Sequence, residues 1–281
     1  MSVTRYPDLA AFAGQHVAPN ISVYGAGGVG KTALLCSAAL PPLSHRVYLA
    51  TSELRTLPEG VAPAIYAAGG IVVEISRVKD LEEVARELMG TKAYDSVVID
   101  GWTVLNRETI NSGLAVGAVP DMTAYRPAMT AMYQVTRLLR AAHIPIFSTM
   151  TEDWDLAEAS TGPQYVGVNV PETARFYAPQ LPAGVRKDWP AQYEALGRMS
   201  LEPPSGGAFD STKFRWVQFA PRERRWIAKT LWEWHKPGLA IPHNECAALF
   251  LLFPWLQETG RLTPEQAEYV QKWTKKARRQ E

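Results

Sequence analysis

The sequence predicts an α/β fold in which helices cover both faces of a mostly parallel sheet. Two observations predict it. Short apolar, β-branched runs alternate with stretches of helical periodicity over residues 21–150. A glycine-rich loop, GAGGVGKT at residues 25–32, follows the first of these runs. Strands that alternate with helices form parallel sheets, and ligands bind at the carboxyl ends of the strands, where this loop is expected.

The elements are predicted in chain order as a strand at 21–24, a helix from about 30, strands at 46–51 and 70–75, a helix at 79–89, a strand at 96–100, a helix at 128–142 and a strand at 145–150. The helix at 79–89 is predicted because its apolar residues fall on one helical face, and Gly90 is expected to end it. Proline-rich residues 154–191 predict a long, irregular segment of the kind that is often mobile.

The C-terminal part is predicted to add a β-hairpin and a helical tail. Residues 214–221 and 224–231 alternate apolar and polar side chains, as hairpin strands do. A helical pattern begins near residue 244. Within it, Thr263 and Gln266 are expected to form a capping box at the start of a helix whose first residue is Pro264. We therefore expect a core domain over 1–240 and a helical extension over 241–281.

Composition excludes several classes of protein. Charge is balanced, with 29 Lys and Arg against 28 Asp and Glu, so nucleic acid binding would need a local patch or an oligomer. Two cysteines and five histidines match no metal-ligand spacing, so no structural metal is expected. The longest apolar run, residues 247–256, is too short to cross a bilayer, and the start lacks signal-peptide character. We expect a cytoplasmic protein that does not bind membranes.

The glycine-rich loop has the pattern G-x-x-x-x-G-K-T of a phosphate-binding P-loop. Its backbone N–H groups would surround a phosphate chain, Lys31 would reach the β and γ phosphates and act in catalysis, and Thr32 would ligate Mg²⁺. A glycine-rich turn that precedes Lys-Thr by chance is the alternative. The predicted nucleotide-binding residues are Gly25, Gly27, Gly28, Val29, Gly30, Lys31, Thr32 and Ala33.

Carboxylates and hydroxyls at the ends of other strands extend this site. Asp100 ends the strand at 96–100 and is predicted to hold Mg²⁺; otherwise it caps the next helix. Glu53 follows the second strand and either polarises the attacking water or is an exposed loop residue. Thr149 and Thr151 either sense the γ-phosphate or are solvated. The chain lacks N-K-x-D, which most GTPases use to read guanine, and L-S-G-G-Q of transporter ATPases, so ATP is the expected nucleotide.

With these motifs in place, the chain resembles the RecA-like branch of the P-loop ATPases, and is most similar there to phage RecA-like ATPases linked to single-strand annealing and recombination. The resemblance runs from about residue 21 to 232, through GAGGVGKT, LATSEL, YDSVVIDGWTVL, FSTMTED and RRWIAKTL. It implies a RecA-like core, ATP with Mg²⁺, a homo-oligomer and Glu53 as the catalytic glutamate. It also implies that Lys229 acts on the γ-phosphate of a neighbouring subunit. The Arg of the family's Lys-x-Arg pair is absent here, because Leu231 holds its position, and Gly101 stands where the family often has Ser.

Basic residues interleaved with aromatic ones predict a surface for single-stranded DNA, where phosphates meet cations and bases stack on rings. An amphipathic hairpin that only packs its aromatics inward would give the same pattern. The predicted DNA-binding residues are Arg186, Lys187, Lys213, Arg215, Arg222, Arg224 and Arg225.

The expected function is therefore ATP binding and hydrolysis by a RecA-like protein that acts on DNA in phage-type recombination or replication. Three other functions fit the same motifs. An assembly or regulatory ATPase would use nucleotide to control protein oligomers without DNA. A nucleotide or small-molecule kinase would use the proline-rich segment as a lid. A module that holds ATP without hydrolysing it is a third, given the absent Arg.

Overall fold

The computed structural model describes residues 17–114, 122–156, 175–181, 189–201, 209–220 and 228–278. The strands in these ranges are β1 Asn20–Gly25, β2 Val47–Thr51, β3 Ile71–Glu74, β4 Ser96–Asp100, β5 Ile146–Leu156, β6 Arg175–Pro179, β7 Ala195–Ser200, β8 Phe214–Gln218, β9 Lys229–Thr230 and β10 Leu239–Pro242. The α-helices are α2 Lys31–Cys36, α3 Val61–Ala67, α4 Leu81–Thr91, α5 Trp102–Asn111, α6 Met122–Arg140, α8 Ala248–Glu258 and α9 Pro264–Arg278.

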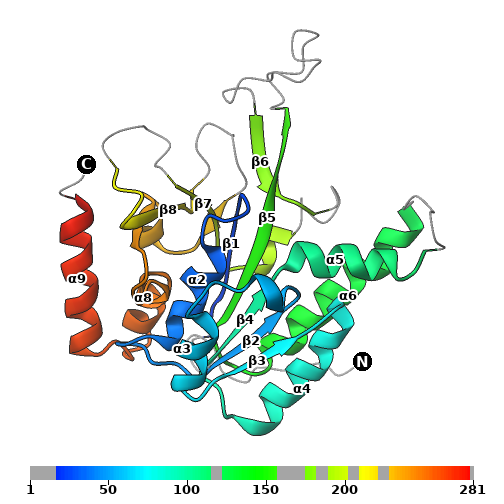
Figure 1. Ribbon diagram of the computed structural model, residues 1–281, viewed down its shortest axis with the longest axis horizontal. Helices are drawn as coiled ribbons and strands as arrows, with labels where there is room; N and C mark the ends of the chain where they lie inside the picture. Colours follow the sequence, from blue (N-terminus) through cyan, green and yellow to red (C-terminus); the bar gives the residue numbers. More distant parts are fainter. Residues whose placement is uncertain are drawn as a thin grey trace, which may run out of the picture.

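The strands form one twisted sheet in the order β10-β8-β7-β1-β5-β4-β2-β3 (Figure 1). The pairs from β7 through β1, β5, β4 and β2 to β3 are parallel. Strand β5 lies between the P-loop strand β1 and β4, which ends in Asp100. The carboxyl ends of β1 and β4 therefore lie at one edge of the sheet, on either side of the middle of β5.

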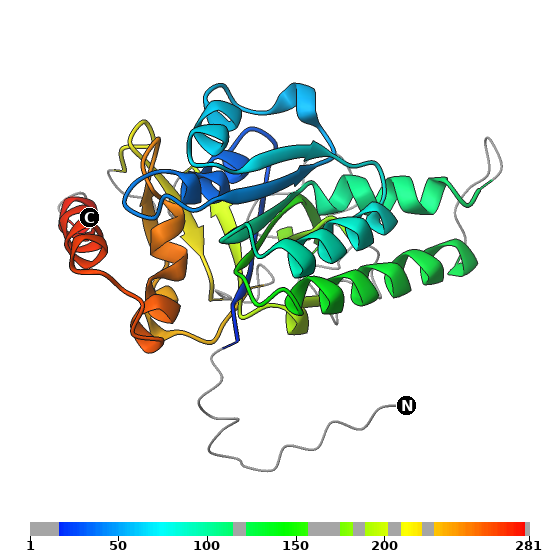
Figure 2. The ribbon, with the colours of Figure 1, turned by 90° about the horizontal axis from the view of Figure 1, so that it is seen from below.

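Helices cover both faces of the sheet (Figure 2). One hydrophobic cluster joins α4, α5 and α6 to the sheet, and a second joins α2, α3 and α8 to the opposite face. The periodicity used to predict α4 holds in the fold, since Leu81, Val84, Ala85 and Leu88 are all buried. The predicted fold class, a mostly parallel α/β sheet with helices on both faces and a helical tail, is confirmed.

Three predicted element ends differ from the observed ones. Helix α4 continues through Gly90 to Thr91, and its C-cap residue Lys92 adopts a left-handed conformation with φ of 47°. Helix α6 begins earlier than predicted and contains Pro127 near its start. Strand β5 runs past residue 150 to Leu156, because β6 pairs with it beyond the end of β1.

The C-terminal strands pair differently from the predicted hairpin. Strand β8 pairs antiparallel with β7 on one side and with β10 on the other. Strand β9, which contains Lys229, pairs with the first residues of β7 and not with β8. The alternating pattern predicted correctly that β8 and β9 are strands, but it does not say which strand each one pairs with. Both β8 and β9 pair with the same edge of β7.

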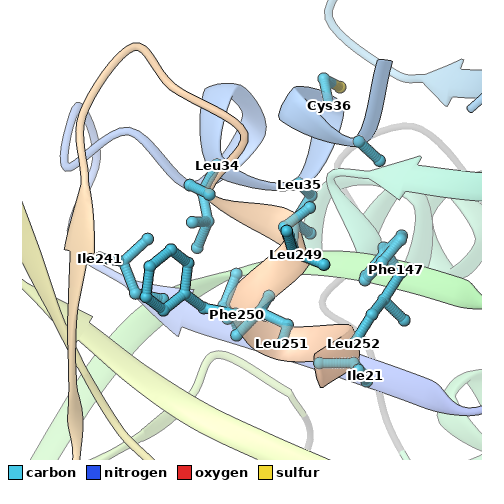
Figure 3. Packing of buried hydrophobic residues seen from close by; sticks show 14 of the residues in the cluster. Ile21, Leu34, Leu35, Cys36, Phe147, Ile241, Leu249, Phe250, Leu251 and Leu252 are labelled. Carbon is cyan, nitrogen blue, oxygen red and sulfur yellow. The ribbon is translucent and has the colours of Figure 1, made fainter. Parts of the chain in front are cut away.

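Helix α8 is buried almost all round and shares one hydrophobic cluster with the P-loop helix α2 and with residues of the sheet. Leu249, Leu251 and Leu252 have no exposed surface and lie among Leu35, Ile21 and Phe147 (Figure 3). A helix that is apolar on every side is a core helix. None of the helices described is both long and apolar enough to cross a membrane.

Helix α9 begins with the predicted capping box. The Gln266 N–H donates to Thr263 Oγ1 at 3.2 Å, and the Thr263 N–H donates to Gln266 Oε1 at 3.0 Å. The boundary at residue 240 between core and extension stays a prediction. Strand β10, at 239–242, is part of the sheet, and α8 shares a hydrophobic cluster with β1 and α2.

Candidate functional site

The P-loop joins the end of β1 to the start of α2, and its glycines are required by conformation and by packing. Gly28 and Gly30 have φ of 78° and 95°, where residues with a side chain are strained. A Cβ at Gly25 would lie 2.4 Å from the carbonyl oxygen of Met199 on β7. The first glycine therefore lets β7 approach the loop, and the other two let the loop turn into the helix.

Lys31 lies inside the turn that this loop makes. Its Nζ donates to the carbonyls of Gly25 and Ala26, both at 2.8 Å. Burial lowers the pKa of Lys31 below the usual lysine value, and the negative charges of Asp100 and Glu152 oppose that shift. The ammonium group is thus held at the loop with two carboxylates near it.

Asp100 lies at the centre of a cluster of hydroxyl groups. Its Oδ1 accepts hydrogen bonds from Thr32 Oγ1 and Thr149 Oγ1, both at 2.7 Å, and its Oδ2 accepts one from Thr51 Oγ1 at 3.2 Å. The Gly101 N–H donates to Thr149 Oγ1 at 2.8 Å. The P-loop and three strand ends, β2, β4 and β5, therefore contribute to one oxygen-rich cluster, the kind of donor set that Mg²⁺ takes.

A cavity of about 420 Å³ opens over this cluster. Lys31, Thr32, Asp100, Thr149 and Thr151 line it, and so does Glu53, whose side chain is exposed. The Glu53 N–H donates to Thr51 Oγ1 at 3.2 Å, which fixes the backbone beside the cluster. The structure therefore brings the predicted residues from three strand ends together around one opening.

A second cavity, of about 640 Å³, adjoins the first and shares Gly28, Gly30 and Pro58 with it. Its apolar lining comes from α2, α3 and β10, and its polar lining includes Arg215, His243 and Glu245. Asp100 lines the first cavity but not this one.

An ion pair lies under the same edge of the sheet. Arg198 Nε donates to Glu152 Oε2 at 2.6 Å, and its guanidinium stacks 3.8 Å above the centre of the Tyr177 ring. Both side chains are largely buried, at 16% and 11% exposed. Because Glu152 is in β5 and Arg198 in β7, the pair connects the two strands that flank β1.

Most of the predicted DNA-binding residues lie outside the described part of the chain, namely Arg186, Lys187, Arg222, Arg224 and Arg225. The other two contact their own chain. Lys213 forms an ion pair with Asp210 at 2.8 Å, and Arg215 donates to the carbonyl of Val29 at 3.1 Å. Lys229 pairs in register with Leu196, near the start of β7, so it does not reach the P-loop of its own chain.

Comparisons with known proteins identify no family for this chain. No protein-family model matches the sequence, and no curated protein matches it. Among solved structures, the chain is similar to flagellar accessory protein FlaH from Methanocaldococcus jannaschii, with a TM-score of 0.39 and 12% identity over 82% of this chain and 87% of that one. It is also similar to the RadB recombinase, with a TM-score of 0.42 and 17% identity over 79% and 97% of the two chains. Similarity this distant assigns no function. The fold class rests on the chain's own strand order.

Two features of this site were not predicted, and a third residue was predicted for a different role. Thr51 is a polar residue at the end of a buried strand, a signal that could have placed it beside Asp100. The contact between Arg198 and Glu152 has no local sequence signal, because 46 positions separate them. Arg215 was predicted, but for a polymer surface, because its basic and aromatic neighbours dominate the pattern.

Proposed function

We propose that this protein binds ATP with Mg²⁺ in its P-loop and hydrolyses it, as a RecA-like ATPase. One observation carries the proposal: the P-loop hydroxyl of Thr32 lies 2.7 Å from the carboxylate of Asp100, which comes 68 positions later in the chain. A glycine-rich turn with no ligand would not need an acid from another strand beside its threonine. The pairing is the one by which P-loop ATPases hold Mg²⁺.

The residues present suit such an ion and its nucleotide. Thr32 and Asp100 would hold Mg²⁺, which neutralises charge on the β and γ phosphates when it is bound. Thr149 and Thr51 orient the carboxylate through their hydroxyl groups. Lys31 and the loop N–H groups bind the phosphates, and the apolar cavity next to Gly30 would take the nucleoside.

Hydrolysis would use Glu53 as the general base. Its carboxylate would accept a proton from water as the water oxygen forms a bond to the γ-phosphorus, and the bond to the β–γ bridging oxygen breaks to release ADP. The exposed position of Glu53 at the cavity is compatible with this role. Lys229 of a neighbouring subunit would approach the γ-phosphate in an oligomer, and Thr149 or Thr151 would sense that phosphate.

Single-stranded DNA in recombination or replication is the proposed partner, on the basis of the basic and aromatic pattern of the sequence. One observation favours the alternative, an ATPase that controls protein assembly. Both DNA-binding candidates that the structure describes, Lys213 and Arg215, contact their own chain.

ATP hydrolysis measured with and without single-stranded DNA tests the proposal and separates the two functions. The proposed function predicts turnover that DNA stimulates and that Lys31→Ala abolishes at the same salt concentration. Turnover that DNA leaves unchanged would favour the assembly ATPase. No turnover in the presence of DNA would refute the enzymatic part, and nucleotide binding would then be tested alone.

A further inference from the structure

Arg215 extends from β8 toward the P-loop and is held there by backbone groups. Its Nε donates to the carbonyl of Val29 at 3.1 Å, and its Nη1 donates to the carbonyls of Phe214, at 3.1 Å, and Ser211. A Cβ at Gly30 would lie 4.0 Å from Arg215 Nε and 3.9 Å from His243 Nε2. The guanidinium therefore lies against the loop, on the side that faces β8 and β10.

Three of the five guanidinium N–H groups are used in these contacts, and the two on Nη2 are left to bind another acceptor. No carboxylate within the described residues forms an ion pair with Arg215, although Glu59 and Glu245 line the same cavity. Other cations nearby differ: Lys213 pairs with Asp210, and Arg198 with Glu152. A half-buried guanidinium without an anionic partner is costly, so this position favours binding of an anion.

The positive charge of Arg215 affects the protonation of the neighbouring His243. The pKa of His243 is lowered, first by burial and then by the positive charge of Arg215. His243 is therefore neutral near neutral pH, and it does not compete with Arg215 for an anion. Both side chains line the cavity of about 640 Å³, at the point where it meets Gly28 and Gly30.

The position of Arg215 indicates which part of a bound nucleotide it would contact. Arg215 lines the cavity proposed for the nucleoside and not the one lined by Lys31, Thr32 and Asp100. We propose that Arg215 binds the α-phosphate of the nucleotide within its own subunit, at the junction between the phosphate chain and the nucleoside. This inference rests on the proposed nucleotide site and makes Arg215 part of it, not part of a polymer surface.

Equilibrium binding of adenosine, AMP, ADP and ATP to the full chain, with Mg²⁺ present, tests this inference. Arg215→Gln should weaken the binding of AMP, ADP and ATP by a similar factor of roughly tenfold or more, because a charge-assisted hydrogen bond is lost. The affinity for adenosine should be unchanged. Arg86→Gln, a matched change of an exposed arginine on α4, should leave all four affinities unchanged. Arg215→Lys should lose less AMP affinity than Arg215→Gln, because it keeps the charge.

Three results would overturn the inference: a loss confined to ATP, an equal loss for adenosine and AMP, or affinities equal to those of Arg86→Gln. If Arg215→Gln does not fold, Arg215→Lys decides. A lower AMP affinity with unchanged adenosine affinity supports the contact, and equal losses overturn it. The underlying site is tested separately by the unaltered chain, because failure to bind any of the four compounds would refute the proposed nucleotide site itself.

Discussion

Shortening one buried side chain of the core helix α8 should lower the free energy of unfolding of the whole molecule, because α8 packs with both the P-loop helix and the sheet. Leu252 has no exposed surface and lies beside Ile21 of β1 and Phe147 of β5 (Figure 3). Leu252→Ala removes three carbon atoms, worth about 2.4 kcal/mol at roughly 0.8 kcal/mol each. The cavity left behind raises the expected loss to about 3–5 kcal/mol.

Urea unfolding followed by circular dichroism measures this loss. Leu231→Ala is the matched control, since Leu231 is 64% exposed, and its effect should stay within about 0.5 kcal/mol. The slope of the transition should be the same in both variants, so that the midpoint alone reports stability. A Leu252→Ala protein as stable as Leu231→Ala would refute the reasoning, and α8 would then be an appendage to a core that ends near residue 240.

Three further predictions concern the nucleotide site. Asp100→Asn should leave ATP binding measurable without Mg²⁺ but remove the gain in affinity that Mg²⁺ gives, as calorimetry would show; an undiminished gain would count against Asp100 as the metal residue. Glu53→Gln should reduce kcat by about a hundredfold or more with ATP affinity unchanged, and an unchanged kcat would remove Glu53 from the mechanism. Because burial lowers the pKa of Lys31, its charge is lost at lower pH than that of an ordinary lysine, so ATP affinity should begin to fall with rising pH before the pH reaches the ordinary lysine pKa. Lys31→Arg stays charged and should show no such fall, and a parallel fall in both would assign the titration to another group.

The same lowered pKa has a consequence for stability. A lysine whose pKa is lower in the folded chain than in the unfolded chain binds fewer protons when folded, so its charged form costs the fold free energy at neutral pH. That cost disappears as pH rises from the folded toward the unfolded pKa. The charge of Lys31 thus destabilises the folded chain, and nucleotide phosphates would compensate for this cost.

The parts of the site that sequence could predict are those set by local order. GAGGVGKT specifies its own turn, and Asp100 could be placed because a polar residue ends an apolar strand in a parallel sheet. Contacts between distant residues were not predictable: Arg215 meets Val29 across 186 positions, and Arg198 meets Glu152 across 46. Both depend on which strands become neighbours.

Strand partners explain the other difference. The alternating patterns at 214–221 and 224–231 identified two strands, but β9 lies beside the first residues of β7, and β8 pairs with the rest of β7 and with β10. The extension of β5 to Leu156 depends in the same way on β6. Period-2 patterns give the faces of a strand but not its neighbour.

Calorimetric titration of the full chain with ATP in the presence of Mg²⁺ tests the central claim most directly. The account predicts one nucleotide site per chain that Lys31→Ala removes while the protein stays folded by circular dichroism. No binding to the unaltered chain, or equal affinity in Lys31→Ala, would contradict the claim that this loop is a nucleotide site.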